Sequence, residues 1–262
     1  MTNQQAKAEA FRQLHVPGQP LVLFNVWDAG STKAVARSGA QAIATSSWAV
    51  ADADGFEDGE RVPLSRVLEN LRRIVSVTTL PVTLDFESGY GDTPELVATA
   101  ITLAMEAGAV GCNLEDSNPS DRRLRATADQ SLRIRAARQA THSHNARFFI
   151  NARTDVFFQS RSDAHDQTML RDAIARARSY ADAGADGLFV PGLTNLTLIE
   201  ELVKTSPLPV NVYNGDGSLS LSALAARGVA RVSFGGLPYA NSMQLLTEAA
   251  RAAVAGVDTA TG

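Results

Sequence analysis

The chain has 262 residues, of which 45% are hydrophobic and 20% charged, with a formal net charge of −4. This composition is typical of a soluble protein with one large core, and the acidic balance argues against binding to nucleic acid or an anionic membrane. No apolar run approaches the ~20 residues of a membrane span, residues 1–20 lack a signal peptide's apolar centre, and one cysteine excludes an internal disulfide and a Cys-based zinc site. We therefore expect a cytoplasmic enzyme or binding protein.

Apolar and polar stretches alternate along the first half of the chain in lengths typical of strands and helices. Residues 2–15 predict a short helix, within a leader that we place at residues 1–18. Pro63 precedes a clean helical stripe, and Gly39 closes an earlier helix. In this half we expect strands at 21–27, 42–46, 82–87 and 110–114, helices at 31–38, 64–74 and 93–108, and loops at 47–61 and 117–126.

The second half repeats the same alternation. We expect strands at 148–152, 187–190, 209–213 and 229–234, and helices at 127–142, 170–183, 195–204, 221–226 and 242–255. Eight strand–helix units in about 250 residues predict parallel strands closed into a (β/α)₈ barrel of the TIM type. A doubly wound open sheet is the alternative. No Pro-, Ser- or Gly-rich linker divides the chain, so residues 1–262 are predicted to form a single domain.

The most informative stretch is PVTLDFESGYGD, from Pro81 to Asp92. It predicts a short strand that ends in Asp85 and Glu87 before a glycine turn. Because these residues are two apart, a strand would place both carboxylates on one side, which is costly unless a cation or hydrogen-bond donors lie between them. Mg²⁺ suits such a place because it prefers oxygen ligands and keeps several waters. A solvated acidic strand end is the alternative.

Polar residues gather at the carboxyl ends of the other predicted strands, which is the face where barrel active sites lie. The set comprises Asp28, Ser46, Ser47, Glu115, Asp116, Arg153, Asp155 and Asn214. Asp28 precedes a helix and is best explained as an ordinary helix cap. Arg153, directly after FFINA, could hold a carboxylate or phosphate with two hydrogen bonds, and a structural ion pair is its alternative role.

The positions of the lysines and of the single cysteine limit the reactions that the chain could catalyse. The three lysines, Lys7, Lys33 and Lys204, fall in the leader or in predicted helices, so no lysine stands at a strand end where a Schiff-base aldolase of this fold needs it. Cys112 lies within the apolar strand VGCNLE. Strand alternation places its thiol on the face opposite Glu115. We therefore expect the thiol to pack in the core, and carbanion chemistry here would depend on a metal.

Seven sequence blocks follow one another from about Leu21 to Leu237: NVWDAGSTKAVARSGAQAIATSS, GFEDGE, DFESGYGD, AGAVGCNLEDS, FFINARTD, AGADGLFVPG and ARGVARVSFGG. In order and spacing they resemble the isocitrate lyase/phosphoenolpyruvate mutase superfamily. ARTD and the acidic DFESGYGD segment are the most specific parts of this resemblance.

This resemblance implies a barrel that binds Mg²⁺ and a 2-oxo acid or its enolate. Asp85 resembles the direct metal ligand, and Glu87 and Glu115 resemble the residues that hold the metal's waters. Asp58 resembles a further acidic residue of that shell, which we group with Glu115 and Arg153 as catalytic. The substrate-binding residues expected are Ser46, Ser47, Asp85, Arg153 and Asn214.

Members of the superfamily are usually tetramers that exchange a C-terminal helix, so the resemblance implies a homo-oligomer, a dimer or tetramer, in which the helix at 242–255 could be exchanged. One departure affects the activity. Lyases of the family carry a K-K/R-C-G-H motif in the loop after the fourth strand, whereas the loop here reads SNPSDRRLRATADQ. A short loop without the cysteine is similar to that of family members that decarboxylate or hydrolyse oxaloacetate-type acids.

Our hypothesis is a Mg²⁺-dependent lyase or decarboxylase that cleaves a C–C bond in a small 2-oxo or 2-hydroxy dicarboxylate through a metal-stabilised enolate. The proton could come from water, Tyr90 or Tyr213. One alternative is a phosphonopyruvate hydrolase or mutase. A second, suggested by the missing cysteine, is a non-catalytic protein that binds 2-oxo acids.

Overall fold

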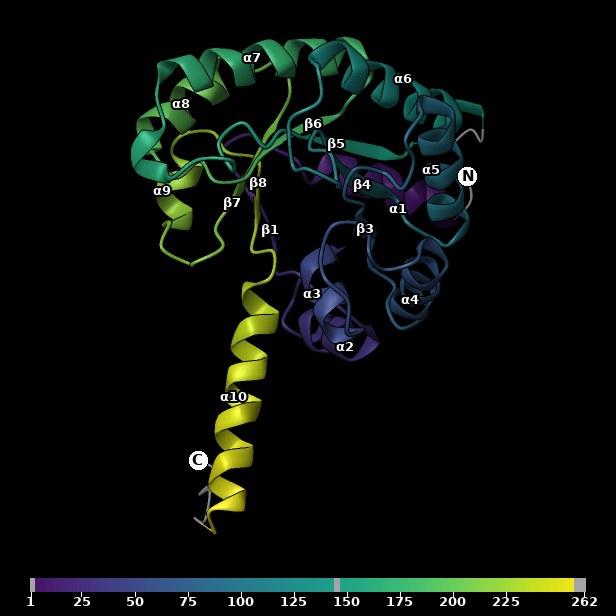
Figure 1. The fold of residues 1–262 in the computed structure, drawn as a ribbon, viewed down its shortest axis with the longest axis vertical. Coiled ribbons are helices and arrows are strands. Elements are labelled where there is room, and N and C mark those ends of the chain that lie inside the picture. Colours follow the sequence, from purple (N-terminus) through teal and green to yellow (C-terminus); the bar gives the residue numbers. More distant parts are fainter. Residues whose placement is uncertain (1–2, 144–146, 257–262) are drawn as a thin grey trace.

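The computed structural model describes residues 3–143 and 147–256. Eight parallel strands form one sheet, with helices around its outside (Figure 1). The strand order is β1-β8-β7-β6-β5-β4-β3-β2. The strands are β1 (Leu21–Leu23), β2 (Ile43–Ala44), β3 (Val82–Asp85), β4 (Gly111–Glu115), β5 (Phe149–Arg153), β6 (Gly187–Val190), β7 (Val210–Tyr213) and β8 (Arg231–Ser233).

A single bridge joins the two ends of the sheet. Val26, just after β1, bridges Thr45, just after β2, in the parallel sense. Val26 N donates to the Ala44 carbonyl at 2.8 Å, and Ser46 N donates to the Val26 carbonyl at 3.1 Å. The bridge completes a (β/α)₈ barrel in one domain, which confirms the predicted fold over the doubly wound open sheet.

Most helices lie where the sequence predicts them, and two differ. The predicted loop at 47–61 contains α3, because Ser46 caps it and Ala49, Val50 and Ala51 are buried. The last helix begins at Leu237 rather than at 242, with Pro238 in its first turn. The α-helices are α1 (Asn3–Gln13), α2 (Ala29–Arg37), α3 (Ser47–Ala53), α4 (Leu64–Ser76), α5 (Pro94–Glu106), α6 (Thr127–Ser143), α7 (Gln167–Asp182), α8 (Leu196–Thr205), α9 (Leu221–Ala225) and α10 (Leu237–Val254), with a 3₁₀ turn at Ser162–Ala164.

The leading helix closes the amino-terminal end of the barrel. Phe11 of α1 packs in one apolar cluster with Leu21 and Phe149, the first residues of β1 and β5. The His15 ring stacks on Phe149 with the ring centroids 4.0 Å apart. This end of the barrel is therefore filled by apolar and aromatic side chains, which leaves the opposite end for a ligand cavity.

Polar side chains fill the middle of the barrel. Asn151 Nδ2 donates to Asn113 Oδ1 at 2.9 Å and to Asn211 Oδ1 at 3.1 Å. Arg231, which is fully buried, donates from Nη2 to Asn113 Oδ1 at 3.1 Å. These amides and the guanidinium form a buried hydrogen-bonded layer directly below the carboxyl ends of the strands.

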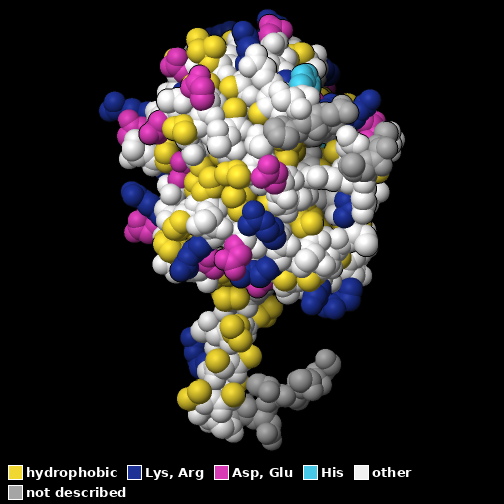
Figure 2. Space-filling view, turned by 90° about the vertical axis from the view of Figure 1, so that its right-hand side faces the viewer, with side chains coloured by type: hydrophobic (Ala, Val, Ile, Leu, Met, Phe, Trp, Pro, Cys, Tyr) yellow, Lys and Arg dark blue, Asp and Glu magenta, His cyan; other side chains and the backbone are white. Residues whose placement is uncertain are grey.

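Helix α10 runs away from the barrel as an isolated arm (Figure 1). Leu245 and Leu246 on this arm are 67% and 62% exposed, and apolar side chains are visible along its length (Figure 2). Among the residues that the structure describes, no helix is both long and apolar enough to cross a membrane.

The packing of His15 predicts a pH dependence of stability. Burial first, and then the charge of Arg231, lower the pKa of His15 from 6.5 to about 3. Between these values the unfolded chain binds a proton that the folded chain does not, so the free energy of unfolding falls as the pH falls, by up to about 1.4 kcal/mol per pH unit. We expect His15→Phe, which keeps a ring against Phe149, to lose this part of the slope. Urea unfolding at pH values across this window measures it, and a wild-type slope in the variant would contradict the assignment.

Candidate functional site

A cavity of about 370 Å³ opens among the carboxyl ends of the strands. Of the predicted site residues, Ser46, Ser47, Asp58, Asp85 and Arg153 line it. The remaining lining residues are Asn25, Trp48, Asn113, Arg122, Phe158, Phe189, Pro191, Tyr213, Gly215, Ser233, Gly235, Gly236, Leu237 and Ala240. The barrel therefore brings together side chains from segments that lie far apart in the sequence.

Asp85, the last residue of β3, is held in place by three donors. Its Oδ2 accepts from the backbone N and the Oγ of Ser47, at 3.1 and 3.0 Å, and its Oδ1 accepts from Asn113 Nδ2 at 3.3 Å. These contacts orient the carboxylate, which still borders the cavity. Ser46 is the neighbouring helix cap, and its hydroxyl accepts from Ala49 N.

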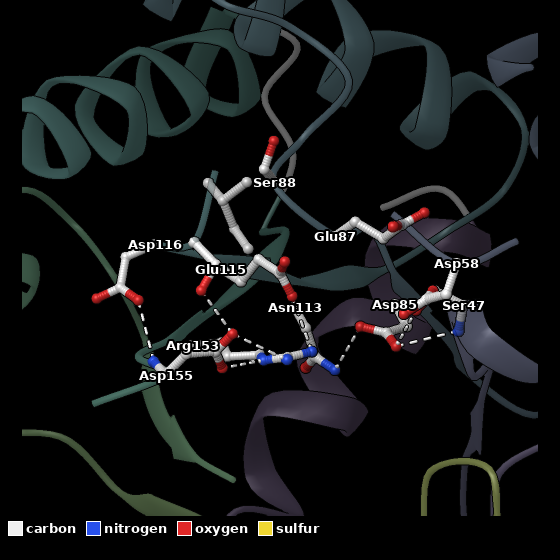
Figure 3. Close-up of polar contacts among 12 residues, drawn as sticks. Ser47, Asp58, Asp85, Glu87, Ser88, Asn113, Glu115, Asp116, Arg153 and Asp155 are labelled. Carbon is white, nitrogen blue, oxygen red and sulfur yellow. Dashed lines mark hydrogen bonds and ion pairs between the residues drawn. The ribbon is translucent and has the colours of Figure 1, made fainter. Parts of the chain in front are cut away.

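Arg153, the last residue of β5, lies between two carboxylates (Figure 3). Its Nε and Nη2 donate to Asp155 Oδ1 and Oδ2 at 2.6 and 3.1 Å, and its Nη1 lies 2.8 Å from Glu115 Oε2. The side chain is only 12% exposed. Both roles considered for Arg153 are therefore compatible with the geometry, because it is paired internally and still lines the cavity.

Glu115 does not border the cavity directly. Burial raises the pKa of Glu115, and the Arg153 guanidinium opposes that shift. The next residue, Asp116, turns away from the cavity. Its Oδ1 accepts from Asp155 N at 3.0 Å, and its Oδ2 accepts from the Tyr180 hydroxyl at 2.8 Å. These contacts fix the ends of β4 and β5 to each other and to α7.

Glu87 departs from the alternation expected of a strand. The strand β3 ends at Asp85, and Glu87 has a φ of +49°. Its carboxylate accepts from Glu60 N at 2.6 Å and from the Tyr90 hydroxyl at 3.1 Å. Burial, then the charge of Asp58, raises the pKa of Glu87 to about 7, and the charge of Asp85 adds to this. The three carboxylates are thus close enough to interact, although Glu87 borders only a small crevice that it shares with Asp85.

Asp58 has a buried carboxylate oxygen that a cation could neutralise. Its Oδ1 is buried and has no hydrogen-bond partner within the described part of the chain, and the residue lines the cavity beside Asp85 (Figure 3). Within residues 3–143 and 147–256, no three His, Cys, Asp or Glu side chains stand close enough to enclose a metal ion. An oxygen-only set with few direct protein ligands fits Mg²⁺, which keeps several waters, and does not fit a metal that needs a closed cage.

Asn214 lies at the predicted place but faces its own loop. Its Nδ2 donates to the Leu219 carbonyl at 3.0 Å, and its Oδ1 accepts from Leu219 N at 3.0 Å. The neighbouring Tyr213 lines the cavity instead. Asn214 thus shapes the loop after β7, and its contacts in the structure are those of a turn residue.

Sequence reasoning did not single out several lining residues. Asn113 shares a side of β4 with Glu115, so strand alternation could have identified it. Asn25 follows β1, and its Oδ1 accepts from the backbone N of Phe234 and of Gly235, both at 2.9 Å. Arg122 comes from the loop after β4, where the sequence pattern carries no sign of which side chain points inward.

The amino-acid sequence of this chain is similar to a known protein family and to several of its relatives. Residues 11–254 match the model of the family described as phosphoenolpyruvate phosphomutase. An uncharacterised protein of Mycobacterium tuberculosis (strain ATCC 25618 / H37Rv) is 36% identical over 93% of this chain and 88% of its own length. The 2-methylisocitrate lyase of Salmonella typhimurium is 30% identical over 77% of this chain and 68% of its own. The oxaloacetate decarboxylase of Bradyrhizobium sp. (strain BTAi1) is 30% identical over 76% and 67%.

Solved structures share the fold. A putative phosphonomutase from Burkholderia cenocepacia J2315 superimposes with a TM-score of 0.93 at 52% identity, over 95% of this chain and 98% of that one. A phosphonopyruvate hydrolase solved with oxalate and Mg²⁺ has a TM-score of 0.81 at 22% identity, over 96% and 88% of the two chains, and shows likeness of fold alone.

The buried position of Cys112 predicts a structural role. The thiol belongs to the main apolar cluster, is 0% exposed, and has its pKa raised by burial. We expect Cys112→Ser to lower the free energy of unfolding by roughly 1–3 kcal/mol, because a hydroxyl enters an apolar layer. Cys112→Ala, which changes volume without adding a hydroxyl, should cost less. Urea unfolding measures both, and rapid alkylation of the native wild-type thiol would contradict the burial.

Proposed function

Because the chain belongs to the phosphoenolpyruvate phosphomutase family, we propose that it is a Mg²⁺-dependent lyase or decarboxylase that cleaves a C–C bond in a small 2-oxo or 2-hydroxy dicarboxylate. One observation carries the proposal: Asp85 and Arg153, a carboxylate and a guanidinium held by fixed partners, line the same cavity. The relatives named 2-methylisocitrate lyase and oxaloacetate decarboxylase support C–C bond cleavage as the class of reaction.

Asp85 would hold the cation, with Asp58 near it and Glu87 and Glu115 set further back. Ser47 and Asn113 keep the Asp85 carboxylate in one orientation, so little rearrangement is needed when the cation binds. When bound, Mg²⁺ would supply the positive charge that stabilises the enolate left by bond cleavage.

Arg153 would bind a substrate carboxylate. Two of the five N–H groups of the guanidinium donate to Asp155, and Nη1 forms an ion pair with Glu115 Oε2 at 2.8 Å, so N–H groups remain on Nη1 and Nη2 for a ligand. The ring of Phe158 lies 5.4 Å from the Arg153 guanidinium carbon and covers one side of it. The group is therefore pre-oriented and partly shielded from water, which strengthens its contact with an anion.

The proton donor that fits best is Tyr213. It lines the cavity, whereas the Tyr90 hydroxyl donates to Glu87. Burial raises the pKa of Tyr213, so its hydroxyl stays protonated at neutral pH and can give a proton to an enolate carbon. Neither a cysteine nor a lysine lines the cavity among the described residues.

The phosphonopyruvate hydrolase or mutase remains the second candidate, because a putative phosphonomutase is 52% identical to this chain. By resemblance to the superfamily, phosphonate-handling members carry a lysine in the loop after β4, and this loop has none, which favours C–C cleavage over phosphorus chemistry. A third candidate, a non-catalytic protein that binds 2-oxo acids, would use the same Asp85 and Arg153.

We further propose that the chain forms a homo-oligomer through α10. In a (β/α)₈ barrel the helix after β8 is expected to cover the barrel wall beside β1. Here α10 points away, and the outward side chains Val22 and Phe24 are left exposed. A second copy of the chain could supply its own α10 to cover them, since the arm carries the exposed Leu245 and Leu246.

The test of the function is a substrate panel with Mg²⁺: oxaloacetate, isocitrate, methylisocitrate, alkylmalates and phosphonopyruvate, scored for oxo-acid products and phosphate. We expect an oxo acid to form without phosphate. Asp85→Asn, which keeps the volume but loses the charge, should lose the activity and bind Mg²⁺ more weakly by roughly tenfold or more. Asp129→Asn, an exposed aspartate in the first turn of α6, is the control.

Each outcome of the panel decides between the candidates. Phosphate release would support the phosphonate reaction, and tight binding without any product would support the non-catalytic protein. Unchanged Mg²⁺ affinity in folded Asp85→Asn would remove Asp85 as the metal ligand.

The assembly has its own test. Leu245→Glu combined with Leu246→Glu places charges on the apolar arm, so we expect a smaller species than wild type in light scattering. Gln244→Glu combined with Thr247→Glu adds the same charge at polar exposed positions of α10 and should leave the mass unchanged. A wild-type chain that is already monomeric would contradict the proposal.

A further inference from the structure

Arg122, in the loop after β4, lines the cavity together with Arg153. We propose that Arg122 binds the second, distal carboxylate of the substrate and so selects dicarboxylates over monocarboxylic acids of the same length. This inference rests on the proposed function and assigns a specificity-determining residue to that site.

The charges around the cavity favour Arg122 for this role. Arg122 and Arg153 are the basic residues among the described side chains that line it. Arg153 already shares its charge between Glu115 and Asp155, at 2.8 and 2.6 Å. A second substrate carboxylate can be matched by a second guanidinium, and the acid paired with Arg122, Asp58, is partly exposed at 27%.

The present partner of Arg122 is weak and replaceable. Its Nη2 lies 3.6 Å from Asp58 Oδ2, between side chains that are 51% and 27% exposed. The same nitrogen donates to the Asp58 carbonyl at 3.4 Å. Ion pairs of this length and exposure contribute little, so an incoming carboxylate can take the place of Asp58 at low cost.

The backbone of Arg122 is nevertheless held in place. Its N donates to the Asn118 carbonyl at 2.9 Å, and its carbonyl accepts from the Gln159 side chain of the loop after β5. A bridge between Ser117 and Leu124 closes the base of the turn. Arg122 has a φ of +58°, which is uncommon for a residue other than glycine and persists only when its surroundings enforce it.

At Gly59 the loop before α4 passes close to the Arg122 guanidinium. The φ of Gly59 is +103°, and a Cβ at this position would lie 3.0 Å from Arg122 Nη2. The loop before α4 and the loop after β4 thus meet at the guanidinium. The backbone of Arg122 is thus held by its own loop and by the loop after β5, and its side chain reaches the loop before α4 at the cavity mouth.

Comparing the binding of two four-carbon acids isolates the contribution of the distal carboxylate. Malate and 2-hydroxybutyrate are close in shape and differ at the distal position, where one has a carboxylate and the other a methyl group. Calorimetry with Mg²⁺ would measure both in wild type, in Arg122→Gln and in Arg123→Gln. Arg123 is the matched control, because it is adjacent, 86% exposed and absent from the cavity wall.

We expect wild type to prefer malate, and Arg122→Gln to bind malate roughly tenfold more weakly while its affinity for 2-hydroxybutyrate stays within about twofold. Arg123→Gln should match wild type for both acids. Equal effects of Arg122→Gln on both acids, no effect on either, or wild-type affinities that do not differ would overturn the role of Arg122 and leave the proposed function standing. A wild-type protein that binds neither acid would overturn both.

Discussion

The site depends on how one buried guanidinium is compensated. Removing the Arg153 charge from water is costly, and Glu115 and Asp155 offset that cost with three short contacts. Asp155 is itself held by the Ser117 hydroxyl at 2.8 Å. Because Glu115 ends β4 and Arg153 ends β5, the ion pair joins two neighbouring strand ends at the cavity.

A second constraint on the site comes from Arg231 in the barrel interior, beneath the carboxyl ends of the strands. Arg231 has no carboxylate at ion-pair distance among the described residues, and burial lowers its pKa to about 9, so it remains a cation at neutral pH. An arginine can only donate hydrogen bonds, so its contact at 3.1 Å makes Oδ1 the end of the Asn113 amide that faces it. The Asn113 Nδ2 then points to Asp85. A charge in the barrel interior therefore contributes to the orientation of the proposed metal ligand through one intervening amide, together with the two donors of Ser47.

The sequence predicted the barrel and the end at which the cavity opens, because strand and helix periods are local properties and parallel strand ends meet on one face. It did not predict α3, since the stretch after Ser47 is rich in Asp and Gly and hides a short capped helix. Alternation failed at Glu87, where the positive φ ends the strand pattern after Asp85. The orientations of Asn214 and Arg122 depend on contacts between loops that are distant in sequence, and no local pattern encodes these.

The arm and the cavity share one helix, yet the structure separates their roles. Leu237 and Ala240 of the first turn of α10 line the cavity. Tyr239 meets Trp27 and Trp48 edge-on, with centroids 5.1 and 5.8 Å apart, and a Cβ at Gly236 would lie 2.4 Å from the Trp48 ring. This first turn is thus packed against the barrel of its own chain, whereas the side chains of Leu245 and Leu246, two turns later, are exposed to solvent. Residues of this chain therefore hold the first turn of α10 at the cavity, whereas the exposed apolar surface of the helix lies on its outer part.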